Sequence, residues 1–175
     1  MAAHPYILQF TQQGIAELVA KKNQGLKGVL SHLAMGSAAY TPNGTETALR
    51  QEQQRVEIRD YQSDADTFYL AGAFDGPEEY DMREMAGFLS DGTLLFLTSH
   101  PTTRIGFKAA GDIHIEKVAV CLRQLPANSL NVQVGVNNLN LIIVKEIAAI
   151  GTALANLQLE QLRQADRINQ ISGAY

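Results

Sequence analysis

A heptad pattern near the C-terminal end of the sequence constrains the fold more than any other feature. Between residues 143 and 171, the spacing between core positions alternates between three and four residues, as is typical of a coiled-coil helix. A lone helix would expose this stripe to water, so something must cover it. With Ile147 at position a, the predicted a and d positions are Ile143, Ile147, Ile150, Leu154, Leu157, Gln161, Gln164, Ile168 and Ile171.

The residues at these positions favour a parallel homotrimer. Isoleucine at both a and d favours three or more strands over two, and this arrangement occurs twice in the stripe, at Ile147 with Ile150 and at Ile168 with Ile171. The Gln161 and Gln164 layer would lower the stability of the coiled coil while fixing its register. The alternative is a long amphipathic helix that packs against its own domain, which would satisfy a monomer.

The start of this helical region has the length of a membrane span but not its composition. The segment 139–157 (LNLIIVKEIAAIGTALANL) contains Lys145 and Glu146 in its first half. A charge near the bilayer centre costs about 2.5–3.5 kcal/mol, so we predict no membrane insertion. The first residues lack the basic region and apolar run that mark a secretory signal, and we expect none.

The preceding part of the chain is predicted to form one α+β domain, rich in antiparallel strands, over residues 1–138, with the helix occupying 139–175. A helix is expected at 12–23, with Thr11 as its N-cap and Ile15, Leu18 and Val19 facing a sheet. A loop rich in small and polar residues follows at 36–47. Alternating polarity and apolar runs predict strands at 26–35, 54–61, 68–74, 112–125 and 129–136.

Three local details of the strands can also be predicted. Asp91 and Gly92 lie between apolar runs and favour a hairpin with a type I′ turn, because both residues tolerate positive φ. The alternation in 26–35 places Val29 on the same face as Leu33 and Met35. The alternation in 112–125 changes phase near Lys117, which predicts either a β-bulge or a change of the buried face.

Composition narrows the range of chemistry. The chain of 175 residues carries a net charge of −4, so it has no general attraction for nucleic acid. Cys121 is the single cysteine, which excludes an intrachain disulfide and Cys-Cys metal motifs, and its apolar surroundings predict a buried, inert thiol. The sequence contains no hydrolase, metalloprotease or phosphate-binding motif, so we expect no catalytic residues, no metal and no cofactor.

One group of residues could still support a metal-dependent enzyme. Asp112, His114 and Glu116 alternate and would project from one face of a strand, where they could bind a metal or share a proton. We favour a solvated strand face, because no second ligand strand is evident. His32 in an apolar strand and His100 before a proline are interpreted as structural residues.

Several short segments, in order, resemble the N-terminal domain of phage tail-collar fibre proteins, a family that includes tail fibres of contractile-tailed phages and R-type pyocins. The resemblance runs from about residue 6 to residue 136. After the glycine of the second segment the family usually has an acidic residue, where this chain has Ser37. The segments are 6–18 (YILQFTQQGIAEL), 30–36 (LSHLAMG), 40–42 (YTP) with 47–49 (TAL), and 82–94 (MREMAGFLSDGTL).

The resemblance implies a homotrimeric virion protein whose N-terminal domain attaches to a baseplate protein. It implies synthesis in a bacterial cytoplasm and assembly into a phage or phage-tail-like particle. Family fibres continue into a shaft and a receptor-binding tip, so a further fibre or receptor-binding protein is expected at the C-terminus. The motif-bearing loop and strand make these residues candidates for baseplate docking: Gly36, Ser37, Tyr40, Arg83 and Glu84. A buried Arg83–Glu84 pair that stabilises the sheet is the alternative role for the last two.

Three functional hypotheses therefore remain. The first is a structural tail fibre or fibre connector that attaches as a trimer to the baseplate. The second is an adhesin whose β-rich domain recognises a cell-surface glycan or protein, although the absence of tryptophan disfavours a sugar-binding platform. The third is the metal-dependent enzyme built on Asp112, His114 and Glu116.

Overall fold

The computed structural model describes residues 7–135 and 139–173, and within the C-terminal helix it describes the side chains of 147–148, 150–168 and 170. The chain divides into two compact units, Met1–Asn138 and Leu139–Tyr175. We call the first unit the head. The second consists mainly of one helix, α2 (Leu139–Ser172).

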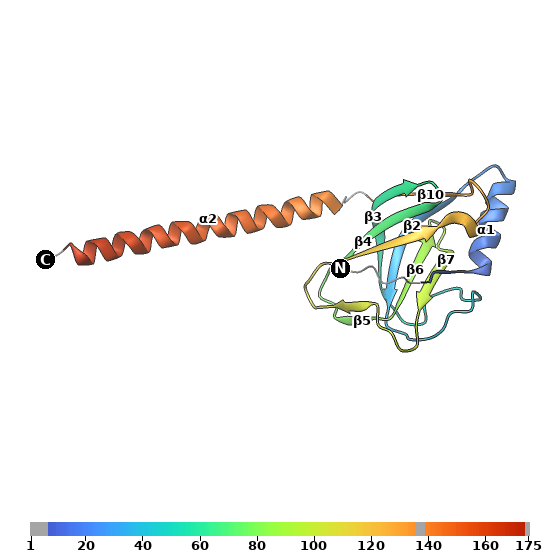
Figure 1. Cartoon of the computed structure of the whole chain (residues 1–175), viewed down its shortest axis with the longest axis horizontal. Coiled ribbons are helices and arrows are strands. Elements are labelled where there is room, and N and C mark those ends of the chain that lie inside the picture. The colour runs from blue at the N-terminus through green and yellow to red at the C-terminus, as the bar shows by residue number, and fades with distance from the viewer. Residues whose placement is uncertain (1–6, 136–138, 174–175) are drawn as a thin grey trace. The chain divides into compact units, whose positions relative to one another are not determined.

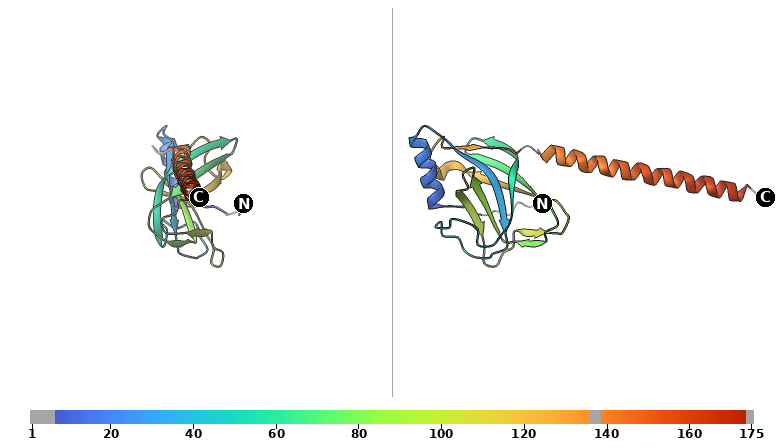
Figure 2. Two further views of the ribbon diagram at one scale, coloured as in Figure 1. Left: turned by 90° about the vertical axis from the view of Figure 1, so that its left-hand side faces the viewer. Right: turned by 180° about the vertical axis from the view of Figure 1, so that it is seen from behind.

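The helix α1 (Gln12–Asn23) forms as predicted. The Oγ1 atom of Thr11 accepts a hydrogen bond from the backbone N–H of Gly14 at 2.9 Å, which satisfies one of the donors left free at a helix N-terminus. Leu18 is fully buried and Ile15 packs against the core, whereas Val19 is exposed. The apolar face of α1 is therefore narrower than predicted, and it covers β7 and β2 (Figures 1 and 2).

The head is built on a mostly antiparallel sheet that curls into a half-barrel. Its strand order is β1-β7-β6-β2-β3-β4-β9, and β10 pairs with β2 in parallel. A small second sheet joins β5 (Tyr80–Met82) to β8 (Gly106–Lys108). The large sheet contains β1 (Gln9–Phe10), β2 (Gly28–Gly36), β3 (Glu52–Asp64), β4 (Thr67–Phe74), β6 (Glu84–Leu89), β7 (Leu94–Ser99), β9 (His114–Cys121) and β10 (Leu130–Val132).

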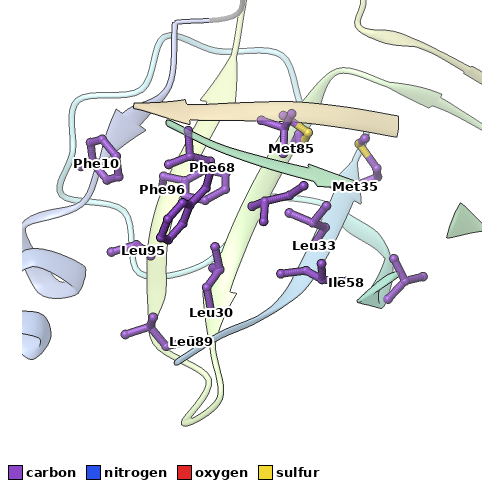
Figure 3. Close-up of a cluster of buried hydrophobic side chains, with 14 of the residues drawn as sticks. Phe10, Leu30, Leu33, Met35, Ile58, Phe68, Met85, Leu89, Leu95 and Phe96 are labelled. Atoms are coloured by element: carbon purple, nitrogen blue, oxygen red, sulfur yellow. The ribbon is translucent and has the colours of Figure 1, made fainter. Parts of the chain in front are cut away.

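The inner face of the half-barrel holds the main core. Alternate residues of the strands converge there, and Figure 3 shows Phe10, Phe68 and Phe96 grouped beside the aliphatic side chains. Phe10 and Phe96 meet edge to face with their ring centroids 6.2 Å apart. The core residues labelled in the figure are Phe10, Leu30, Leu33, Met35, Ile58, Phe68, Met85, Leu89, Leu95 and Phe96.

A second, smaller apolar cluster lies on the other face of β2, β6 and β7. It is covered by residues 37–51, which we call the strap. The strap contributes Tyr40 and Leu49 to a cluster that also contains Ala34, Ala86, Phe88, Leu94 and Leu97. The loop predicted at 36–47 is thus an irregular segment that buries part of the sheet.

Two predicted details of the strand faces are wrong. In β2, Leu30 rather than Val29 is in the core, because the pairing with β6 shifts register between Leu30 and His32. Such a shift moves the following side chains to the opposite face.

In β9, the pairing with β4 continues without a shift from Cys121 to His114, and the less exposed side chains stay on one face, so neither a bulge nor a change of the buried face occurs near Lys117. Ile115 is consequently exposed. Cys121 is exposed too, which corrects the prediction of a buried thiol.

The predicted hairpin joins β6 and β7, but its turn differs from the prediction. Gly92 has a φ of 88°, whereas Asp91 is not among the residues with positive φ. The N–H of Gly92 donates to the Leu89 carbonyl, and the N–H of Leu89 donates to the Thr93 carbonyl. This pattern is that of a three-residue loop with a left-handed glycine, in which only one residue needs positive φ.

The last predicted strand is shorter than expected. It is β10, paired with residues 28–30 of β2, while the segment predicted as the end of the long strand forms the 3-10 helix η1 (Leu122–Gln124). Beyond β10, the N–H of Gln133 donates to the Leu30 carbonyl and that of Gly135 to the Ile58 carbonyl. Residue 136, the predicted end of the strand, lies outside the described residues.

Candidate functional site

The predicted apolar stripe lies on α2 and is exposed in the single chain. The a and d residues with described apolar side chains, Ile147, Ile150, Leu154, Leu157 and Ile168, are 55–67% exposed. Gln161 and Gln164 are exposed as well. The side chains of Ile143 and Ile171 lie outside the described residues.

The charge distribution along α2 is uneven. Residues 147–159 contain no charged side chain, whereas the following turns carry Glu160, Arg163, Asp166 and Arg167. The heptad analysis also missed two exposed leucines, Leu159 and Leu162, which are 48% and 65% exposed and lie outside the a and d positions. These two leucines could have been found in the sequence, because residues three apart lie on the same face of a helix and this face differs from that of the a and d positions.

In the head, Glu84 is the centre of a buried polar cluster. Its side chain is completely buried. The carboxylate accepts hydrogen bonds from the backbone N–H of Gln51 at 2.7 Å, from that of Arg50 at 3.1 Å and from the Tyr40 hydroxyl at 2.9 Å. These bonds satisfy the buried acid and fix both ends of the strap to β6.

The Tyr40 side chain continues this cluster to the surface. Burial and then the charge of Glu84 raise the pKa of the Tyr40 hydroxyl well above its usual range, so it remains a hydrogen-bond donor. The Arg50 guanidinium lies 3.8 Å from the centroid of the Tyr40 ring, in a cation–π contact that covers it.

The five predicted docking residues come together at this cluster, but three of them are buried. Gly36, Tyr40 and Glu84 are buried, and a Cβ at Gly36 would lie 2.4 Å from the Glu84 carboxylate, which explains the glycine. Buried side chains have little surface to offer a partner, so their role in this conformation is to position the strap. Ser37 is partly exposed and accepts a hydrogen bond from Gln53 at 2.8 Å.

The predicted Arg83–Glu84 pair does not form. The Arg83 guanidinium lies 3.8 Å from the Asp81 carboxylate instead, and its backbone N–H donates to the Gly36 carbonyl at 2.9 Å. Arg83 lies between β5 and β6 with its side chain partly exposed, whereas the Glu84 side chain is buried under the strap.

The three candidate metal ligands are only partly brought together. The His114 Nε2 atom lies 3.0 Å from the Glu116 carboxylate on the inner side of β9, while Asp112 precedes the strand and is exposed. Within the part of the chain that the structure describes, no three His, Cys, Asp or Glu residues are grouped as metal ligands. The arrangement therefore provides one hydrogen-bonded pair, His114 with Glu116, rather than a set of three ligands.

The other two histidines considered in the sequence have local hydrogen-bond partners. The His32 Nδ1 atom lies 2.7 Å from the Ser31 hydroxyl. The His100 Nδ1 atom accepts from the backbone N–H groups of Thr102 and Thr103 at 3.2 Å and 3.1 Å, which closes a turn. These contacts are of the structural kind predicted from the sequence.

Comparisons with known proteins add no relative. Neither a family model, nor a curated protein, nor a solved structure matches this chain. Among the described residues, no helix combines the length and the apolar character needed to cross a bilayer.

Proposed function

We propose that this protein is a structural tail fibre or fibre connector of a phage or phage-tail-like contractile particle, and that it attaches to the baseplate as a homotrimer. The observation that carries the proposal is the exposed apolar stripe of α2. The head supplies the attachment domain and α2 forms a parallel three-stranded coiled coil.

The free energy gained by burying the apolar stripe supports an oligomer. Burying an Ile or Leu side chain completely contributes about 1.5–3 kcal/mol. The five described apolar side chains of the stripe are about 60% exposed, so covering them contributes on the order of 5–9 kcal/mol per chain before ordering costs. A parallel trimer covers all five at once, because each a or d side chain packs between those of its neighbours.

The resemblance to tail-collar fibres supports the baseplate role, since its short segments converge in space. The segments 30–36 and 82–94 contain β2 and β6, which pair with each other. The segment 40–49 lies in the strap that the Glu84 carboxylate holds against β6. Motifs separated in sequence thus build one structural unit, as expected if they describe a common domain.

Trimerisation would also strengthen attachment. Three heads joined by one coiled coil bind a baseplate at high effective concentration, so that contacts that are weak alone give a stable attachment. In the sequence, three residues separate Gly135 of the head from Leu139, the first residue of α2, so each head is joined to the coiled coil by a short stretch of chain.

The test is the mass in solution of the full chain and of three variants. We expect about three times 19.1 kDa for the full chain by light scattering and a single-chain mass when the chain stops after Asn138. Leu154→Asp places a charge in the core and should also give monomers. Asn156→Asp, a matched change at an outward position of the same helix, should remain trimeric. A monomeric full chain, or a trimer that survives Leu154→Asp, would contradict the proposal.

A further inference from the structure

The outer face of β4 and β9 differs from the rest of the half-barrel. Over β2, β6 and β7, the strap covers the outer apolar residues. Over β4 and β9, Tyr69 and Ile115 are 47% and 38% exposed, and Ala119 is exposed beside them. Ala71 and Ala73 on the same face of β4 are buried, so the exposed apolar side chains of this surface are Tyr69, Ile115 and Ala119.

Charges border this surface on opposite sides. Lys117 lies on β9, which is the last strand of the sheet and has one of its edges open among the described residues. Asp60 and Asp64 lie on β3, at the positions paired with Ala71 and Thr67. None of these three charged groups makes an ion pair among the described residues. The surface therefore has a basic edge, an apolar centre and an acidic edge.

We propose that this surface is the contact between neighbouring heads of the trimer, a proposal that rests on the function proposed above. A threefold axis requires a heterologous interface, in which one patch of each subunit meets a different patch of the next. The β9 edge with Ile115 and Lys117 is one patch, and the β3–β4 side with Asp60, Tyr69 and Asp64 is the complementary one. A second copy of the head fits because it supplies the opposite charge together with exposed apolar side chains of its own.

The place where the chain leaves the head agrees with this assignment. Gly135 donates its N–H to the Ile58 carbonyl on β3, two residues before Asp60. The acidic edge is thus adjacent to Gly135, the last described residue of the head. In a parallel trimer the three chains meet where α2 begins, four residues after Gly135 in the sequence, so this edge is held close to the neighbouring heads at high effective concentration.

Zero-length carbodiimide cross-linking of mixed trimers tests the contact. Full chains of normal and of ¹⁵N-labelled protein are unfolded together, refolded, cross-linked and digested, and the products are identified by mass spectrometry. We expect an amide link from Lys117 to Asp60 or Asp64 that joins a light chain to a heavy chain. Tyr69→Glu should lower the yield of this link at least tenfold without changing the trimer mass, whereas Lys27→Glu, an exposed lysine elsewhere on the head, should leave the yield unchanged.

Light scattering of the same samples separates the two proposals. A trimer in which Lys117 links only within one chain, or links to no Asp60 or Asp64, overturns the head contact and leaves the coiled coil intact. A monomeric full chain overturns the proposed function and the head contact with it. Charge reversal gives a second measurement: Lys117→Glu should remove the additional protection from hydrogen exchange that the β9 amides gain in the trimer relative to the monomeric Leu154→Asp chain, and adding Asp60→Lys with Asp64→Lys should restore it.

Discussion

Replacing Glu84 by glutamine should destabilise the head by about 2–4 kcal/mol. In the native protein, both carboxylate oxygens of this fully buried side chain accept hydrogen bonds, from two backbone N–H groups and the Tyr40 hydroxyl. Glu84→Gln keeps one oxygen but puts an NH₂ group where the other stood. The Tyr40 hydroxyl can rotate to accept from it, whereas a backbone N–H cannot. At least one N–H of the strap then loses its acceptor, which costs about 1–3 kcal/mol, and the remaining bonds lose the strengthening that a charged acceptor provides.

Urea unfolding of the head, ended after Asn138 and followed by circular dichroism, measures this loss directly. Glu52→Gln is the matched control, because the Glu52 carboxylate pairs with Arg55 at 2.7 Å on an exposed surface. Surface pairs of this kind contribute about 0–1 kcal/mol. Tyr40→Phe removes one of the three bonds to Glu84 and should cost about 1 kcal/mol.

Amide hydrogen exchange locates the damage. In Glu84→Gln, exchange should accelerate most at Arg50 and Gln51, because their N–H groups point at the replaced side chain. A Glu84→Gln head whose unfolding free energy stays within about 0.5 kcal/mol of the wild type, with unchanged exchange at these two amides, would refute the argument that this carboxylate holds the strap.

Three further predictions follow from contacts elsewhere in the chain. The pKa of the Asp91 carboxyl is lowered, because the hydrogen bonds from Lys21 and Thr93 outweigh the opposing effect of burial. The contribution of Asp91 to the stability of the fold is therefore present above the pKa of the unfolded chain and is lost as the pH falls through the lower pKa of the folded state. In urea unfolding at several pH values, Asp91→Asn should cost under about 1 kcal/mol at pH 7 and nothing at pH 2. The buried Lys108 side chain donates hydrogen bonds to the carbonyls of Gly76, Glu78 and Ala109. Lys108→Met should therefore lower the unfolding free energy by about 2–3 kcal/mol and speed proteolysis near residue 77. Unchanged proteolysis would argue against a role for Lys108 in holding this loop. A Cβ at Gly87 would lie 2.3 Å from the Phe96 ring, so Gly87→Ala should lower the melting temperature of the head. A Cβ at Gly151 meets nothing within 4 Å, so Gly151→Ala should stabilise α2 by about 0.5–1 kcal/mol, measured as a higher helix content by circular dichroism.

The sequence predicted best those elements whose signals are local. The bounds of α1 follow from Thr11 and from the Asn-Gln-Gly stop, both adjacent to the helix. The strand β3 follows from alternation of polar and apolar residues, and β4 follows from a short apolar run bounded by turn residues. The helix α2 follows from a repeat of three to four residues.

Errors arose where the decisive partner is distant in sequence. The phase of β2 depends on its irregular pairing with β6, about 50 residues away, so Val29 and Leu30 could not be distinguished from alternation alone. Cys121 and Ile115 are exposed because they lie on the outer face of β9, and alternation along one strand does not show which of its two faces the rest of the fold covers. The partners of Glu84 lie 33–44 residues earlier in the chain, and no local pattern connects them.

The sequence by itself determined that the chain has an α+β head followed by a long helix with one apolar stripe, because hydrophobic periods of two and of three to four residues are properties of neighbouring residues. The tertiary structure alone decided which side chains of the head are covered. Gly36, Tyr40 and Glu84 are buried by the strap, and the β4–β9 face remains open. The physical reason is that burial is a property of all the segments that meet at one place, and the strap and strands that meet at Glu84 are brought together only by the fold.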